Sequence, residues 1–191
     1  METAPSLGWV WQKYETDVIA FVSEWYILSY SAKWLNGLHI TKGLPNYQGY
    51  KPHQPNDEKL VKDIWKLLNE AEIIIGHNLD RFDLRKAQAR FAFWGLPPPK
   101  PYLTIDTLKI ARKHFAFNSN KLDDLGEYLR LGRKVKHQGF ELWEKCMAGD
   151  RHAWKKMLSY NRMDVILLER VFNYFKPWIN SPKRLLKLLG D

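Results

Sequence analysis

Cysteine is almost absent from this 191-residue sequence, which contains only Cys146. A single cysteine excludes an internal disulfide framework and a zinc site built from several cysteines, and we expect no disulfide-linked partner. No stretch approaches the roughly 18 uncharged apolar residues of a membrane helix, so no membrane partner is expected. The amino terminus also lacks a basic region followed by an apolar run, and these absences together predict a cytoplasmic protein.

Acidic residues are the minority among the charged ones, since 21 Asp and Glu stand against 30 Lys and Arg. The resulting net charge of +9 and the pI near 9.5 favour a polyanionic partner such as nucleic acid. Hydrophobic residues make up 45% of the chain, with nine each of Trp, Tyr and Phe, which is enough for one sizeable core. We expect most tryptophans in that core, Trp34, Trp65 and Trp143 among them.

The order of predicted elements indicates an α/β domain. The segment 27–35 mixes aromatic with small residues and predicts a strand, which turns at Asn36-Gly37 into a second strand at 38–41. The β-branched run 72–76 predicts a buried strand. Because this hairpin precedes the first predicted helix, we expect a mixed sheet rather than an all-parallel one. With Asn56 and Asp106 as N-caps of the first and third, the helices are predicted over 56–70, 82–94, 106–111, 122–131, 140–147 and 150–175.

Acidic residues after the buried strand form the first candidate site. Asp80 and Asp83 follow strand 72–76, at the end where open α/β sheets place their sites. Carboxylates at that position could hold divalent cations for phosphodiester hydrolysis. The competing interpretation is that both residues only cap the next helix. Their neighbour His77 is expected to be a hydrogen-bonded structural residue, because the histidines show no zinc-ligand spacing.

A second candidate pair lies on the last helix, where Tyr160 and Asp164 are four residues apart and share one face. Such a pair also occurs by chance in many helices. Together, however, Asn78-x-x-x-Phe82-Asp83 and Tyr160-x-x-x-Asp164 resemble the second and third motifs of the tyrosine-type DEDD 3′–5′ exonucleases, which belong to the DnaQ-like superfamily and have a ribonuclease H-like fold. Ser159 stands where the histidine-type subgroup would have its histidine.

The resemblance extends beyond these motifs to a stand-alone bacterial and phage branch of the superfamily. The matching segments are 25–28, 32–35, 95–99, 105–109, 119–122 and 139–143. We therefore expect one ribonuclease H-like exonuclease domain over residues 1–178, encoded by a bacterium or a phage. Residues 179–191 form a basic amphipathic tail whose role the sequence does not decide.

The first motif of the family is incomplete in this sequence. It is D-x-E at the end of the first strand, and Glu2-Thr3-Ala4-Pro5 matches its end, whereas the Asp has no position. The resemblance thus implies a ribonuclease H-like mixed β-sheet flanked by helices, with the first central strand missing or truncated. Glu15 and Asp17 cannot replace the Asp, because their order is reversed and the resemblance places them in a loop. We favour an incomplete gene product over a degenerate relative, since loss of a central strand would expose two sheet edges.

What the resemblance implies chemically is removal of nucleotides from 3′ ends of single-stranded DNA, with RNA as an alternative substrate. Glu2, Asp83 and Asp164 would bind two Mg²⁺ or Mn²⁺ ions, and Tyr160 would orient the attacking water. Asn78 and Phe82 are expected at the substrate.

Basic residues near position 132 could add phosphate contacts. Lys134 and Lys136 lie there with Arg130 and Arg133, and the alternative is an ordinary solvated loop. The main rival function is a catalytically impaired ribonuclease H-like module that binds nucleic acid without cutting it. A ribonuclease H-like endonuclease or resolvase ranks last, because it does not predict Tyr160 four residues before Asp164.

Overall fold

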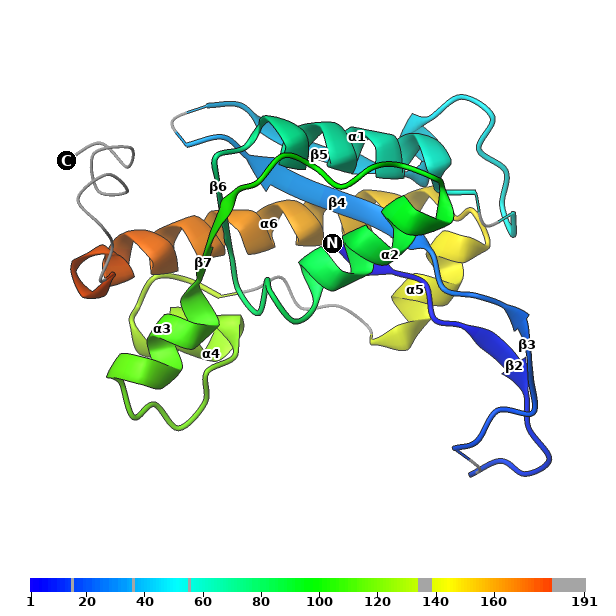
Figure 1. The fold of residues 1–191 in the computed structure, drawn as a ribbon. Coiled ribbons are helices and arrows are strands. Elements are labelled where there is room, and N and C mark those ends of the chain that lie inside the picture. The colour runs from blue at the N-terminus through cyan, green and yellow to red at the C-terminus, as the bar shows by residue number, and fades with distance from the viewer. Residues whose placement is uncertain (15, 36, 55, 134–138, 180–191) are drawn as a thin grey trace.

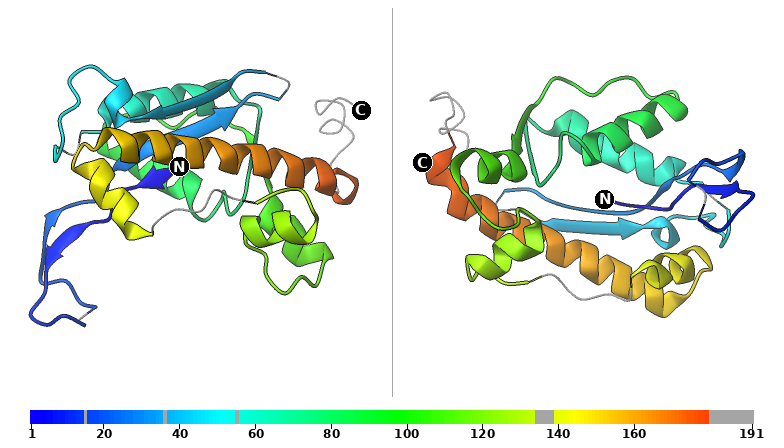
Figure 2. Two further views of the ribbon diagram at one scale, coloured as in Figure 1. Left: turned by 180° about the vertical axis from the view of Figure 1, so that it is seen from behind. Right: turned by 90° about the horizontal axis from the view of Figure 1, so that it is seen from below.

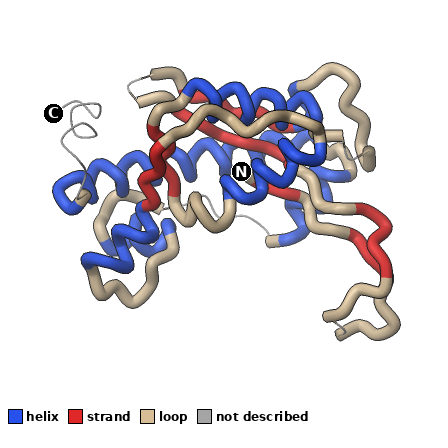
Figure 3. Tube along the Cα trace, viewed as in Figure 1, coloured by secondary structure: helices blue, strands red, loops and turns tan. Residues whose placement is uncertain are grey.

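The computed structural model describes residues 1–14, 16–35, 37–54, 56–133 and 139–179. Within these ranges, seven β-strands form three separate sheets (Figure 1, Figure 3). The strands are β1 (Glu2–Thr3), β2 (Leu7–Trp9), β3 (Ala20–Ser23), β4 (Ile27–Lys33), β5 (His39–Gly43), β6 (Ile73–Gly76) and β7 (Leu103–Asp106). The α-helices in this part of the chain are α1 (Glu58–Glu70), α2 (Asp83–Phe93), α3 (Thr107–His114), α4 (Leu122–Tyr128), α5 (Phe140–Met147) and α6 (Arg151–Phe175). Short 3₁₀ turns lie at Leu44–Asn46 and Lys176–Trp178. This α/β architecture confirms the predicted fold class.

The largest sheet is antiparallel and has the strand order β1-β4-β5. Strand β4 contains two residues of strand-favouring types, Ile27 and Tyr30, and both are buried together with Leu28. It pairs with β5 over residues 29–33, where Ala32 lies opposite Ile40. On its other edge, the short β1 reaches only the first half of β4. This pairing confirms the predicted hairpin between residues 27 and 41.

Strands β6 and β7 form a separate parallel pair, in which Ile75 lies opposite Ile105. Helix α2 lies between them in the chain, as parallel pairing requires a crossover connection. Because both strands run in the same direction, their carboxyl ends meet at one edge. The segment that begins at His77 and the helix that begins at Thr107 therefore start side by side.

Helices cover both faces of the β4–β5 sheet (Figure 2). Helices α1 and α2 lie on one face, and α5 and α6 lie on the other. Leu60 and Val61 of α1 are fully buried against the sheet, and Met157 of α6 is fully buried from the opposite side. A second apolar cluster joins α3, α4 and the last turns of α6, and includes Leu125 and Phe175. Helix α6 therefore contributes to both clusters.

A buried ion pair ties the start of α1 to β4 and α2. The carboxylate of Asp57 is fully buried and accepts hydrogen bonds from the Ile27 amide at 2.8 Å, Arg90 Nε at 2.9 Å and Trp94 Nε1 at 2.7 Å. Asp57 is also the N-cap residue of α1, where we predicted Asn56. The prediction was one residue off, although the Asn56 side chain does accept a hydrogen bond from the Glu58 amide at 3.1 Å.

The hairpin of β2 and β3 was not predicted. It projects from the body of the molecule (Figure 1) and carries several large apolar side chains with exposed fractions above half, among them Trp9, Trp11 and Phe21. Its strands alternate little between apolar and polar residues, so the usual period-two signal of a half-buried strand is missing.

Two further expectations concern the core and the tail. Trp65 and Trp143 pack against the main core, as predicted, whereas Trp34 follows the last residue of β4 and is 40% exposed, so its assignment to the core was wrong. The amphipathic tail predicted at 179–191 falls outside the described residues except for Ile179. Within the described ranges, no helix combines the length and apolarity that crossing a membrane requires.

Candidate active site

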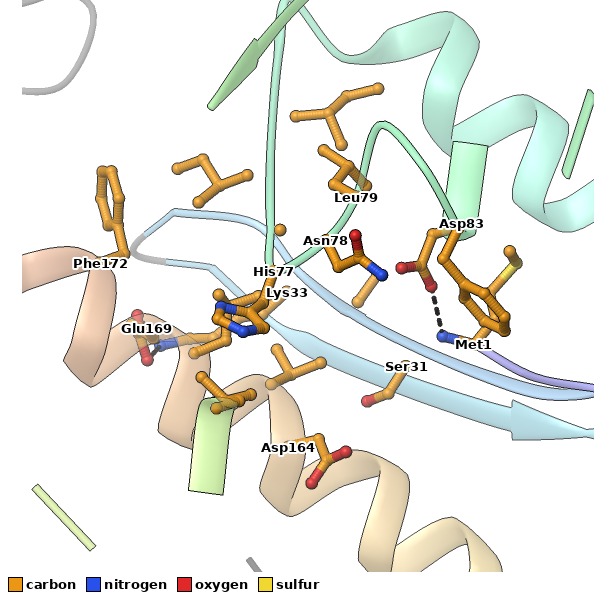
Figure 4. A pocket seen from close by; sticks show the side chains of 18 of the residues that line it. Met1, Ser31, Lys33, His77, Asn78, Leu79, Asp83, Asp164, Glu169 and Phe172 are labelled. Carbon is orange, nitrogen blue, oxygen red and sulfur yellow. Dashed lines mark hydrogen bonds and ion pairs between the residues drawn. The ribbon is translucent and has the colours of Figure 1, made fainter. Parts of the chain in front are cut away.

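One large cavity, with a volume of about 1090 Å³, lies between β4 and β6 and is bordered by α1, α2 and α6. Figure 4 shows the side chains that project into it. Six residues predicted from the sequence as metal ligands, catalytic groups or substrate contacts line this cavity, and they are Glu2, Asn78, Phe82, Asp83, Tyr160 and Asp164. The fold thus brings together residues from β1, the segment after β6, and α6.

Asp83 is the first residue of α2, and its carboxylate faces the amino terminus of the chain. The Met1 α-ammonium group donates a hydrogen bond to Asp83 Oδ1 over 2.8 Å, and this ion pair is drawn in Figure 4. A negative charge in the first turn is also favoured by the helix dipole. The interpretation that Asp83 only caps the helix is incomplete, because the N-cap residue is Phe82 and the Asp83 carboxylate pairs with Met1.

Three carboxylates influence the Met1 α-amino group. Burial lowers the pKa of the Met1 α-amino group, yet the charges of Asp83, Glu2 and Asp164 outweigh that effect and leave the pKa raised above 8.0. The three carboxylates therefore act on one position, which the ammonium group takes in this structure. Asp164 lies on α6, on the opposite wall of the cavity from Asp83 (Figure 4).

The segment from 76 to 82 is held by the neighbouring strand. Asp106 Oδ1 accepts a hydrogen bond from the Asn78 amide at 2.9 Å, while it also caps α3 through the Leu108 amide at 3.0 Å. Asn78 adopts φ +59°, a conformation that Asn tolerates better than most residues. At Gly76, a Cβ would lie 2.7 Å from the Leu79 side chain, so only glycine fits. The predicted N-cap role of Asp106 is confirmed, and its contact to this segment was missed.

His77 makes the hydrogen bonds expected of a structural histidine. Its Nδ1 lies 2.9 Å from Thr107 Oγ1, and its Nε2 lies 2.9 Å from the Asn120 carbonyl oxygen. Both ring nitrogens thus connect the segment after β6 to α3 and to the loop before α4. Since both are occupied, the role we expected for His77 is confirmed.

Tyr160 and Asp164 share the face of α6 that borders the cavity. Tyr160 is buried, with an exposed fraction of 8%. Its ring makes an edge contact with the ring of Trp143, and the two ring centroids are 6.5 Å apart. One turn of helix separates it from Asp164. Between them, Asn161 is anchored to β4 by a hydrogen bond from its Nδ2 to Ser29 Oγ at 3.0 Å. This bond fixes the rotation of α6 against the sheet.

The donor set fits hard divalent cations in its chemistry, because carboxylate oxygens are the ligands that Mg²⁺ and Mn²⁺ prefer. Asp83 already pairs with one positive charge in this structure, since the Met1 ammonium nitrogen lies 2.8 Å from Asp83 Oδ1. In the part of the chain that the structure describes, however, no group of three or more His, Cys, Asp and Glu side chains is arranged to hold a metal ion. Glu2, Asp83 and Asp164 are thus a partial ligand set here.

Other predicted substrate contacts are not tested. Lys134 and Lys136 lie outside the described residues, and so does Glu15. Of their basic neighbours, Arg133 is paired with Glu127. Asp17 is exposed in the connection between β2 and β3, outside the cavity lining, which agrees with the expectation that it does not replace the missing Asp.

Sequence reasoning did not find the polar residues at the far end of the cavity. Lys33 of β4 and Glu169 of α6 form an ion pair there, with Lys33 Nζ 2.7 Å from Glu169 Oε2 (Figure 4). For Glu169, the only sequence signal was its position on the same helix as Asp164, five residues further along; for Lys33 there was none. The apolar residues between the two ends were recognised as strand and helix formers but not as a cavity lining.

Comparisons with known proteins agree with the fold. A family model described as RNase_H superfamily matches residues 28–176. The protein NEN3 of Arabidopsis thaliana is 33% identical over 76 residues, which are 39% of this chain and 15% of that protein. The family B DNA polymerase of the archaeon Pyrobaculum calidifontis superposes with a TM-score of 0.62 at 16% identity, over 77% of this chain and 21% of the polymerase. The chain thus spans a small part of either protein.

Proposed function

The chain belongs to the RNase_H superfamily, and from that premise we propose that it is a metal-dependent 3′–5′ exonuclease acting on single-stranded DNA. One observation carries the proposal: the three acidic residues and the tyrosine of the expected site line the same cavity, although they come from sequence positions as far apart as Glu2 and Asp164. The basic composition, with a net charge of +9, suits a polyanionic substrate. Cytoplasmic location and a bacterial or phage origin stay predictions.

In this proposal, Glu2 and Asp164 would hold one Mg²⁺ or Mn²⁺ ion and Asp83 would hold a second. The bound ions would activate a water molecule and stabilise the leaving 3′ oxygen. The Tyr160 hydroxyl orients the attacking water, and the contact with Trp143 limits the freedom of its ring. Phe82, which is 40% exposed at the cavity, offers an aromatic face to the terminal base, and Asn78 positions the adjacent sugar or phosphate.

A second candidate function is a nucleic-acid-binding module that does not cut. The observation that favours it is the partial ligand set: although the three acidic residues line one cavity, no three His, Cys, Asp or Glu side chains among the described residues are arranged to hold a metal ion. The two functions differ in turnover but share the binding surface. An endonuclease or resolvase does not account for Tyr160 beside Asp164.

The decisive experiment is degradation of a 5′-labelled single strand of DNA, and of the matching RNA, with Mg²⁺ or Mn²⁺. We expect a ladder that shortens from the 3′ end, and loss of that ladder with EDTA. Asp83→Asn should lower the rate by at least about a hundredfold, because a displaced metal ligand misaligns the reacting groups. Glu144→Gln, at an exposed position of α5 outside the cavity, is the matched control and should leave the rate unchanged.

The outcomes separate the candidates. A strand that is bound but not shortened would support the binding module. Internal cuts in a closed circular strand would overturn the exonuclease in favour of an endonuclease. A folded protein that neither binds nor cuts would overturn both.

A further inference from the structure

Five aromatic rings form a continuous row at the end of the molecule where α3, α4 and the last turns of α6 meet (Figure 1). Tyr128 of α4 contacts Phe117, with ring centroids 5.2 Å apart, and Phe117 stacks on Phe115 at 4.9 Å. Phe115 contacts Trp178 at 5.1 Å, and Trp178 stacks on Tyr174 at 5.9 Å. We call these five side chains the aromatic row. It extends from α4, across the connection between α3 and α4, to the end of α6.

Both ends of the aromatic row are open to solvent. The two inner rings are partly buried and pack against the second apolar cluster, which accounts for them as part of the fold. Tyr128, Tyr174 and Trp178, however, have exposed fractions of 69%, 42% and 37%. In residues 107–133 and 170–179, no large aliphatic side chain is exposed. The large apolar side chains exposed here are thus all aromatic, whereas those of the β2–β3 hairpin are both aromatic and aliphatic.

The same region carries more than half of the net charge of the chain. Residues 107–133 and 170–179 contain eight Lys and Arg against three Asp and Glu, which is +5 of the net charge of +9. Arg112 and Lys113, at the end of α3, are exposed and take part in none of the ion pairs between described residues. These two cations are therefore available beside the aromatic row.

Neighbouring parts of the same chain are poor candidates to cover this surface. Residues 134–138 and 180–191 contain five Lys and Arg and one Asp, so their net charge has the same sign as the surface. Charge complementarity therefore favours a polyanionic ligand.

The aromatic row adjoins the candidate active site. Arg112 of α3 and Asn118 of the connection after α3 line the same cavity as Asp83 and Asp164. The two inner rings of the row lie between Arg112 and Asn118 in the sequence. A strand whose 3′ end lies at the carboxylates would therefore meet the exposed rings where it leaves the cavity on this side.

We propose that the aromatic row binds a single strand of nucleic acid on the 5′ side of the nucleotide at the active site. Bases stack on the exposed rings of Tyr128, Tyr174 and Trp178, while Arg112 and Lys113 contact phosphates. Rings without exposed aliphatic neighbours favour bases over a membrane, because a membrane-binding surface also carries residues such as leucine. The inference rests on the proposed function for the identity of the ligand, but not for its cleavage.

The test measures binding by the whole chain in EDTA, so that no metal-dependent cleavage shortens the strand. The probe is a fluorescein-labelled oligothymidylate of about 15 nucleotides, within the usual site sizes of single-strand-binding folds, and fluorescence anisotropy follows its binding. Tyr128→Ala and Trp178→Ala should each weaken binding by about tenfold, because each removes a ring on which a base stacks. Tyr14→Ala is the matched control, since Tyr14 is 88% exposed beside Lys13 but lies far from the row in the β2–β3 connection. It should leave the affinity unchanged.

Two further variants separate stacking from charge. Tyr128→Trp keeps an aromatic ring and should retain the affinity of the parent chain. Lys113→Gln should reduce the slope of log affinity against log salt concentration by about 0.7, the value for one phosphate contact with a single strand. An oligouridylate should respond to the same variants, because stacking on aromatic rings does not read the sugar. Circular dichroism checks that each variant is folded.

The outcomes decide the proposal. It is overturned if the parent chain does not bind the strand, if neither alanine variant in the row weakens binding, or if Tyr14→Ala weakens it equally. Binding of phosphatidylserine vesicles, with no binding of the strand, would assign the surface to a membrane instead. A chain that binds through the row without cutting supports this inference and excludes the exonuclease, whereas a chain that cuts with no effect of the row variants does the reverse.

Discussion

Removal of the Asp57 carboxylate is the sharpest test of what holds the cavity walls in place. Asp57 connects three parts of the chain, because its buried carboxylate bonds the Ile27 amide in β4, Arg90 in α2 and Trp94 after α2. Helix α2 carries Asp83 at its first residue, and β4 forms one wall of the cavity. The ion pair thus lies behind the candidate site rather than in it.

The expected loss of stability follows from the burial of the Arg90 side chain. The Arg90 side chain is 7% exposed, so Asp57→Ala leaves an almost fully buried guanidinium group without its carboxylate. Breaking a buried ion pair at one partner costs about 3–5 kcal/mol. That is a large part of the stability of about 5–15 kcal/mol that is usual for a domain. With a urea slope near 2 kcal/mol/M, a loss of about 4 kcal/mol lowers the midpoint by about 2 M.

Equilibrium urea unfolding, followed by tryptophan fluorescence and circular dichroism, measures this shift. Glu58→Ala is the matched control, because it removes only the exposed pair with Lys62 and should cost about 0.3–0.5 kcal/mol. Adding Arg90→Met to Asp57→Ala should recover part of the loss, since it removes the uncompensated charge. A midpoint for Asp57→Ala within about 0.5 M of the parent protein, at an unchanged slope, would refute the reasoning.

Three further predictions concern other sites. Burial raises the pKa of Cys146 to about 12, so the native thiol should react with a disulfide reagent orders of magnitude more slowly than in urea, as followed by absorbance. Burial, then the charges of Arg162 and Lys33, lower the pKa of His39 below 6.5, so the free energy of unfolding should fall as the pH drops below 6.5. In His39→Gln, the urea midpoint should depend less steeply on pH in this range. Gly126→Ala would place a Cβ 2.6 Å from the Gly132 carbonyl oxygen and should cost about 1–3 kcal/mol by thermal unfolding.

The fold was predictable where the sequence carries a strong local signal. The helix predicted over 150–175 matches α6 within one residue, and the β-branched run that ends at Gly76 predicted β6. The hairpin of β2 and β3 gave no such signal, because its side chains are exposed on both faces. The N-cap of α1 was predicted one residue too early, at Asn56 instead of Asp57. Asp57 forms an ion pair with Arg90, 33 residues away in the sequence, and no local pattern reveals such a contact.

The candidate site was predictable as a set of residues but not as an arrangement. Motif spacing selected Asp83, Tyr160 and Asp164, and the structure places all three at one cavity. The contact between Met1 and Asp83 spans 82 residues along the chain, so only the tertiary fold could reveal it. The separation of the β1-β4-β5 sheet from the β6-β7 pair was not predicted, and neither were the size and apolar lining of the cavity between them.

Helix α6 links the two apolar clusters of the molecule. Its 25 residues extend about 37 Å, and it packs on the β4–β5 sheet with its first half and on α3 and α4 with its second. Asp164 lies near the middle of this helix, and Asp83 lies on α2, which the Asp57–Arg90 ion pair joins to β4. Both carboxylates are therefore held by elements that pack on the β4–β5 sheet, and this sheet is the common frame that sets their separation.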